Sequence, residues 1–213
     1  MVARMTGQWA KRAGKVVIVL AFAILVETSF GNDLRVHEVA PDFMLLLAVS
    51  AGFSAGPDAG AVVGFASGLV ADLFLQNTPF GLSALAYSLA GFAVGWMAAY
   101  MAGQRLLLAP FAAAAGTVMG VTLFVVIGYV VGEQQLVAPG KRWLVELALI
   151  EALYAAVFAL PAAVLMGWAL RRPAMTSATL AAAAPSSVVE LPPRRRQASL
   201  RSRRRHRPRA RVR

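Results

Sequence analysis

Long apolar blocks are the feature of this sequence that most restricts its fold. Of the 213 residues, 59% are hydrophobic and only 15% are charged, whereas an average soluble domain is about 45–50% apolar and about 25% charged. The apolar residues fall in six blocks, and a helix needs roughly 20 such residues to cross the hydrocarbon core of a bilayer. The sequence therefore predicts an all-α, polytopic integral membrane protein with six transmembrane helices.

Turn residues separate the expected helices. Residues 56–58 (Gly-Pro-Asp) predict a tight turn, and Thr78 is expected to cap a fourth helix whose first residue is Pro79. Pro161 predicts a kink in the sixth helix. The second helix is short for a complete span, which leaves open a tilted helix or half of a re-entrant pair with the third. The expected helices are 15–30, 42–56, 58–75, 79–102, 106–131 and 143–170.

Most of the net charge of +11 lies at the C-terminal end of the chain. Residues 171–213 contain thirteen Arg and one Glu, whereas residues 1–170 contain eight Lys or Arg and nine Asp or Glu. Basic residues favour the cytoplasmic side of a membrane. Because they precede the first helix and follow the fourth and sixth helices, both termini are predicted to be cytoplasmic. Three regions result: a basic cytoplasmic N-terminus, 1–14; a six-helix transmembrane domain, 15–170; and a disordered Arg-rich cytoplasmic tail, 171–213.

The Arg-rich tail allows three interpretations. It can be a solvated segment that reinforces the orientation, or it can bind anionic lipids of the inner leaflet. It can also bind nucleic acid or an acidic protein. No aromatic residues are interleaved with the arginines for base stacking, so nucleic acid is the least favoured partner.

Carboxylates gather at the predicted outer ends of the helices. A charge at the centre of a membrane helix costs about 2.5–3.5 kcal/mol on insertion scales. These side chains should therefore face one another, a partner or water. They are Glu27, Asp42, Asp72, Glu146 and Glu151.

Asp72 ends a stripe of small residues on the third expected helix. Four residues at intervals of four share one face: Gly60, Gly64, Gly68 and Asp72. The glycines permit close approach of another backbone, so we interpret the aspartate as structural, placed at a helix–helix contact. It is expected to accept hydrogen bonds from the loop backbone at 76–78. A role in partner binding or transport is the alternative.

The sequence contains no catalytic or metal-binding pattern. It has two histidines and no cysteine, and it lacks a phosphate-binding loop, a nucleophile elbow and a zinc motif. We expect no enzyme activity, no cofactor and no metal. Gly116 and Gly120 have the spacing of a small-residue contact between membrane helices, which leaves a homodimer as an open alternative.

Three motifs resemble the rod shape-determining MreD family. They are Pro-Asp-Phe-Met-Leu-Leu at 41–46, Gly-x-x-x-Gly-Phe-x-x-Gly-Leu-x-x-Asp-Leu at 60–73, and Pro-Phe-Gly-Leu-x-Ala-Leu at 79–85. By its layout the resemblance extends over residues 15–170, and the basic tail lies outside it. The candidate structural or partner-interface residues are Asp42, Gly60, Gly64, Gly68, Asp72 and Gly81.

The resemblance implies a non-enzymatic scaffold of the cell-elongation complex, which synthesises peptidoglycan and controls cell shape at the bacterial inner membrane. The implied partners are an MreC-like protein, a membrane peptidoglycan synthase with its transpeptidase, and the MreB cytoskeleton. The implied fold is similar to that of the substrate-binding subunits of ECF vitamin transporters. A small-molecule transporter subunit is therefore the alternative function, and it predicts an outer ligand pocket around Glu27, Asp42, Asp72 and Glu151.

Overall fold

The computed structural model describes residues 2–30, 35, 39–74, 79–100, 105–132 and 140–171. Over these residues the chain forms six α-helices and no β-strand, which confirms the predicted all-α class. Apart from Arg171, the predicted tail lies outside the described residues, as do the predicted loop partners at 76–78. The helices are α1 (Val2–Phe30), α2 (Phe43–Ala55), α3 (Pro57–Phe74), α4 (Leu82–Tyr100), α5 (Arg105–Val131) and α6 (Lys141–Leu170).

Four helices in the described part of the chain are long and apolar enough to cross a membrane. The segments are Pro57–Phe74, Leu82–Tyr100, Leu107–Val131 and Arg142–Leu170. α2 is apolar but has only 13 residues, or about 20 Å at ~1.5 Å per residue. The predicted number of six spans therefore stays a prediction.

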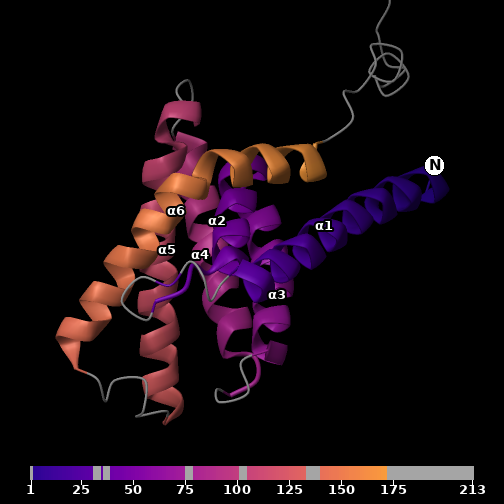
Figure 1. Ribbon diagram of the computed structural model, residues 1–213. Helices are drawn as coiled ribbons and strands as arrows, with labels where there is room; N and C mark the ends of the chain where they lie inside the picture. The colour runs from indigo at the N-terminus through magenta and orange to yellow at the C-terminus, as the bar shows by residue number, and fades with distance from the viewer. Residues whose placement is uncertain are drawn as a thin grey trace, which may run out of the picture. The chain divides into compact units, whose positions relative to one another are not determined.

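α2 lies in the middle of the helices (Figure 1). Every residue from Met44 to Phe53 is buried, and α2 contacts each of the other five helices. A helix that is hydrophobic on all sides is typical of a buried position. Because α2 is surrounded by helices, its short length does not leave its backbone facing lipid.

The start of α2 is the predicted one, and a local cap accounts for it. Asp42 is the N-cap, and its Oδ1 accepts a hydrogen bond from the Leu45 N–H at 2.8 Å. Pro57 is the first residue of α3, where the missing N–H of a proline leaves no helical hydrogen bond unmade. Gly56 between the two helices has a φ of 97°, which glycine adopts without strain.

The predicted start of α4 at Pro79 is wrong, because α4 begins at Leu82. Gly81 has a φ of 98°, and a residue with a positive φ does not continue a right-handed helix. The Leu82 N–H donates to the Pro79 carbonyl at 3.2 Å. Residues 79–82 therefore form a turn that precedes the helix.

α1 and α6 are the two longest helices. Helical structure in α1 begins at Val2 rather than near Lys15, so it runs through the basic segment. α6 contains Pro161 and visibly changes direction along its length (Figure 1), as expected for a proline that removes a backbone hydrogen bond. The Ser54 hydroxyl of α2 donates to the Ala163 carbonyl at 3.1 Å, which joins α2 to this part of α6.

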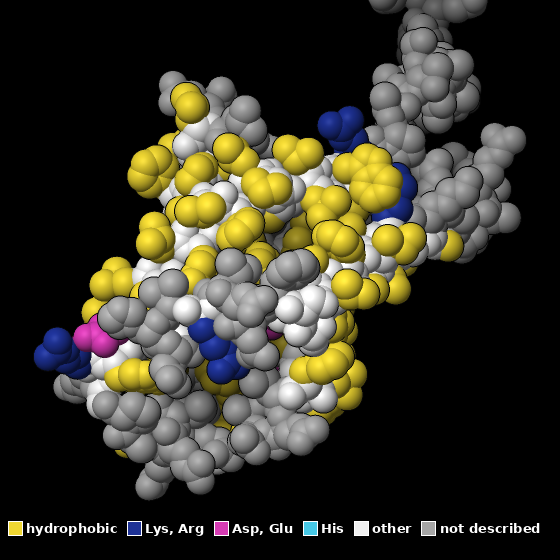
Figure 2. All heavy atoms as spheres, in the orientation of Figure 1, with side chains coloured by type: hydrophobic (Ala, Val, Ile, Leu, Met, Phe, Trp, Pro, Cys, Tyr) yellow, Lys and Arg dark blue, Asp and Glu magenta, His cyan; other side chains and the backbone are white. Residues whose placement is uncertain are grey.

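Hydrophobic side chains cover much of the outside of the helices. Figure 2 shows them over the visible face, where charged side chains are few. Val62, Leu107 and Phe111 are each at least 70% exposed. Such broad exposure of apolar groups is unusual in a soluble monomer and suits contact with lipid.

Candidate functional site

The glycine stripe of α3 packs directly against the backbone of α4. We call this contact the glycine seam. Methyl groups added at Gly60, Gly64 and Gly68 would overlap the backbone of Gly91, Tyr87 and Ala84, respectively. A side chain at any of these three positions would force the helices apart, because the neighbouring atoms belong to the backbone and cannot rotate away.

A second set of glycines brings α2 to the same contact. A methyl group at Gly52 of α2 would overlap the Gly91 carbonyl, and one at Gly95 would lie 2.5 Å from the Pro57 nitrogen. These positions were not predicted from the sequence. The spacing of four between Gly91 and Gly95 was the available signal, since it places both on one face of α4.

Asp72 lies at the end of the glycine seam and binds the first turn of α4. It is 5% exposed. Its Oδ2 accepts hydrogen bonds from the N–H groups of Gly81 at 2.8 Å and Ala84 at 3.3 Å, and its Oδ1 accepts one from Ser83 at 3.1 Å. These N–H groups have no partner within α4, since a helix leaves its first donors unpaired.

Asp72 therefore caps a helix to which it does not belong. An N-cap side chain normally accepts a bond from the second or third residue of its own helix, and here an aspartate of α3 does this for α4. Its negative charge also faces the positive end of the helix dipole. Thr78, the predicted cap, lies outside the described residues.

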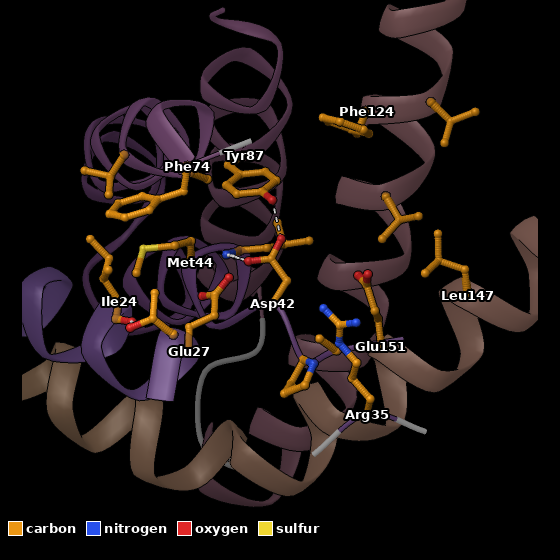
Figure 3. Close-up of a pocket in the computed structure, with 18 of the residues that line it drawn as sticks. Ile24, Glu27, Arg35, Asp42, Met44, Phe74, Tyr87, Phe124, Leu147 and Glu151 are labelled. Atoms are coloured by element: carbon orange, nitrogen blue, oxygen red, sulfur yellow. Dashed lines mark hydrogen bonds between the residues drawn. The ribbon is translucent and has the colours of Figure 1, made fainter. Parts of the chain in front are cut away.

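Three carboxyl groups line a cavity of about 540 Å³ at the end of the bundle where α1 and α3 finish and α2 and α4 begin. Glu27 of α1, Asp42 before α2 and Glu151 of α6 point into this space (Figure 3). We call it the carboxylate cavity. Its volume lies in the range of small-molecule sites, roughly 300–1,000 Å³. Asp72 does not line it, so the predicted pocket of four carboxylates is wrong in that residue.

Asp42 is held between two hydrogen-bond donors. Its Oδ1 binds the Leu45 N–H, and its Oδ2 accepts a hydrogen bond from the hydroxyl of Tyr87. Tyr87, on α4, is 5% exposed. Tyr87 was not predicted from the sequence, because nothing in its local sequence marks it as a partner of a residue 45 positions away.

Glu27 and Glu151 have incomplete hydrogen bonding. Glu27 faces the backbone N–H groups of Phe43 and Met44 at the start of α2. Its Oε2 and the Oε2 of Glu151 are buried, and neither has a hydrogen-bond partner among the described residues. The three cavity carboxyl groups also interact electrostatically with one another.

Basic residues contribute little to the described part of the cavity. Arg35 lines it, and its side chain is exposed. The Arg142 Nε instead donates to Glu146 Oε1 at 3.0 Å on the exposed face of α6. Glu146 thus lies apart from the other carboxylates. Within the described ranges, no three His, Cys, Asp or Glu side chains are arranged to hold a metal ion.

Gly116 and Gly120 of α5 face inward. A methyl group at Gly116 would lie 2.7 Å from side-chain atoms of Val49 and Val94, and one at Gly120 would lie 2.6 Å from a side-chain atom of Leu45. Both glycines are buried against α2 or α4 of their own chain. The small-residue contact is therefore made within the chain, and the homodimer stays an untested alternative.

A family model described as rod shape-determining protein MreD matches residues 5–169. The chain belongs to the MreD family. The matched region includes both the glycine seam and the carboxylate cavity of this MreD-family chain, and the resemblance found in the sequence is confirmed. No curated protein matches the chain, and no solved structure matches it. Family membership and the apolar helices together support an integral inner-membrane protein with a role in the determination of rod shape.

Proposed function

We propose that this protein is a non-enzymatic scaffold of the cell-elongation complex, which synthesises peptidoglycan. The family match over residues 5–169 carries the proposal. The protein would cross the bacterial inner membrane six times, with both termini in the cytoplasm. Its proposed partners are an MreC-like protein, a membrane peptidoglycan synthase with its transpeptidase, and the MreB cytoskeleton.

The packing of α2, α3 and α4 supports a docking role. The glycine seam leaves the α3 and α4 backbones little freedom to slide, and the Asp72 cap fixes the start of α4. Two large apolar side chains beside this cap, Leu73 and Phe80, are each about two-thirds exposed. The candidate residues that are buried therefore act by holding the shape of this surface, and the exposed neighbours would contact a partner.

Affinity purification tests the scaffold proposal. The tagged full-length protein is isolated from its native membrane in mild detergent, and mass spectrometry identifies what accompanies it. We expect an MreC-like protein and the wall synthases. Recovery of ATPase subunits in their place would contradict the scaffold role.

An isosteric pair of variants sharpens this test. Asp72→Asn keeps the size of the side chain but removes the charge that faces the α4 dipole, so membrane insertion should persist while partner recovery falls. Glu146→Gln makes the same chemical change on the exposed face of α6 and should leave partner recovery unchanged. Equal recovery with both variants would show that Asp72 does not shape the docking surface.

The carboxylate cavity favours a second candidate function, the substrate-binding subunit of a small-molecule transporter. Its volume of about 540 Å³ and its mainly apolar walls suit a ligand. This alternative predicts ATPase subunits in the purification described above. A fold similar to that of the ECF substrate-binding subunits stays a prediction.

We also propose that the Arg-rich tail attracts anionic lipids of the inner leaflet. Basic residues near such a surface contribute about 1 kcal/mol each, and residues 171–213 carry thirteen arginines. The tail, released as a peptide, should float with vesicles that contain phosphatidylglycerol and remain unbound with neutral vesicles. Equal flotation with both would contradict the lipid role.

A further inference from the structure

A small pocket adjoins the carboxylate cavity. Its volume is about 10 Å³, close to the minimum that one water-sized group requires. Asp42 and Glu151 line both spaces. Thr117 of α5 lines the small pocket and is 2% exposed, and its Oγ1 has no hydrogen-bond partner in the described part of the chain.

The small pocket has hydrogen-bond acceptors in excess of donors. The buried Oε2 of Glu151 and the Oγ1 of Thr117 are both without a partner among the described residues. The hydroxyls of Thr117 and Tyr154, which also lines the pocket, can each donate one hydrogen bond, fewer than the lone pairs that the two carboxyl groups offer. Asp42 accepts bonds from the Leu45 N–H and the Tyr87 hydroxyl and also faces the Met44 N–H, and each carboxylate oxygen has two acceptor positions. Buried polar atoms without partners are costly, so this arrangement favours a group that donates several hydrogen bonds and carries positive charge.

We propose that the carboxylate cavity and the small pocket together bind a small molecule with a primary ammonium group on an apolar body. An ammonium group is compact and has three donors, which match acceptors on Asp42, Thr117 and Glu151. A guanidinium or quaternary ammonium group is too large for a space of about 10 Å³. This site goes beyond the scaffold role and does not depend on it.

The larger cavity provides room for the apolar body of the ligand. Leu45, Phe124 and Leu147 belong to its lining, which is mainly apolar, and Figure 3 shows Phe124 and Leu147 on the same side of the space as Glu151. Burial of apolar surface stabilises binding by about 25 cal/mol per Å². Arg35 lines the larger cavity but not the small pocket.

Thermal unfolding of the purified full-length protein in detergent tests the site. The probes are n-hexylammonium, 1-hexanol and hexyltrimethylammonium, which share the hexyl chain and differ in the head group. We expect only n-hexylammonium to raise Tm in a saturable manner, because ligands that bind only the folded state stabilise it. An equal or larger effect of 1-hexanol or hexyltrimethylammonium would overturn the proposal.

Three variants locate the ammonium group. Glu151→Gln should weaken the apparent affinity for n-hexylammonium about tenfold, and Thr117→Val, which keeps the side-chain shape, should weaken it about threefold. Glu146→Gln removes the same charge from the exposed face of α6 and should leave the affinity unchanged. Equal affinities of Glu146→Gln and Glu151→Gln would overturn the site, and if Glu151→Gln fails to fold, an unchanged affinity of Thr117→Val would do so. No partner protein takes part in the measurement, so its outcome is separate from that of the scaffold test.

Discussion

The surroundings of Asp72 and the carboxylate cavity are two regions of the same helical body, and each holds buried carboxyl groups in a different manner. Asp72 is 5% exposed, and three backbone N–H groups bind it. Glu27 and Glu151 each have a buried oxygen without a partner among the described residues. Burial therefore does not by itself distinguish a structural carboxylate from one that can bind a ligand. The completeness of its hydrogen bonding is the more useful distinction.

The two regions also differ in how they are packed. Next to Asp72 the glycine seam brings α3 and α4 into backbone contact. Around Glu27, Asp42 and Glu151 the helices enclose about 540 Å³. We therefore expect substitutions at the seam to affect folding and substitutions in the cavity to affect binding.

Removal of the long-range cap should have the largest effect on stability. Asp72→Ala leaves three N–H groups at the start of α4 without their acceptor. The Ser83 and Ala84 groups are buried and the Gly81 group is partly buried, and each buried unpaired group costs roughly 1–3 kcal/mol before local relaxation. We expect a loss of about 3–5 kcal/mol in the free energy of unfolding, measured by denaturant titration in micelles. A loss below about 1 kcal/mol, within the range of an ordinary exposed N-cap, would remove the contrast between the two regions.

A large side chain in the glycine seam should have the second largest effect on stability. Gly64→Leu must push apart the α3 and α4 backbones, and overpacking of this kind typically costs about 1–3 kcal/mol. Gly167→Leu is the matched control, since an added methyl group there meets no atom within 4 Å. The same titration should show a loss for Gly64→Leu alone, and equal stability of the two variants would contradict the close packing of the seam.

The turn before α4 should tolerate little change in its backbone. Gly81 has a φ of 98°, where an L side chain is strained by about 1–2 kcal/mol. Gly81→Ala should therefore lower the free energy of unfolding by about that amount. Gly14→Ala, in open space within α1, should leave it unchanged or raise it slightly. A stable Gly81→Ala protein would indicate that this turn is free to rearrange.

The smallest change in stability is expected in the cavity. Glu151→Gln removes a carboxyl group whose ionised form Glu27 and Asp42 would repel, and one oxygen of this group is buried without a described partner. The free energy of unfolding should therefore change by less than about 1 kcal/mol, toward greater stability. A loss of unfolding free energy as large as that of Asp72→Ala would mean that Glu151 is structural. The carboxyl groups of both regions would then have the same structural role.

Features encoded within short segments were predictable from the sequence. The expected helix 106–131 corresponds to α5, Arg105–Val131, and the expected helix 42–56 corresponds to α2, Phe43–Ala55. Apolar blocks, turn residues and helix caps act over a few residues, so no tertiary information is needed to read them. The family could also be read from ordered motifs between residues 41 and 85, and the match over residues 5–169 confirms it.

Features that depend on contacts between helices were not predictable in the same way. Thr78 and Pro79 have the local pattern of a helix start, but Asp72 supplies the cap from another helix and α4 begins at Leu82. Gly116 and Gly120 have the spacing of a contact between membrane helices, but the sequence did not show that Gly116 faces Val49 of the same chain. Spacing shows that residues share a face of a helix, but it does not show which neighbour that face meets.

The sequence alone determined the helical class of this protein, its family and the stripe that ends at Asp72, because these follow from hydrophobicity and from spacing along a helix. Only the tertiary structure decided the separation of the carboxylates. It placed Asp72 against the backbone of α4 and brought Glu27, Asp42 and Glu151 to one cavity with Tyr87. The physical reason is that hydrogen-bond satisfaction depends on donors from distant segments, and the packing of whole helices determines which donors arrive.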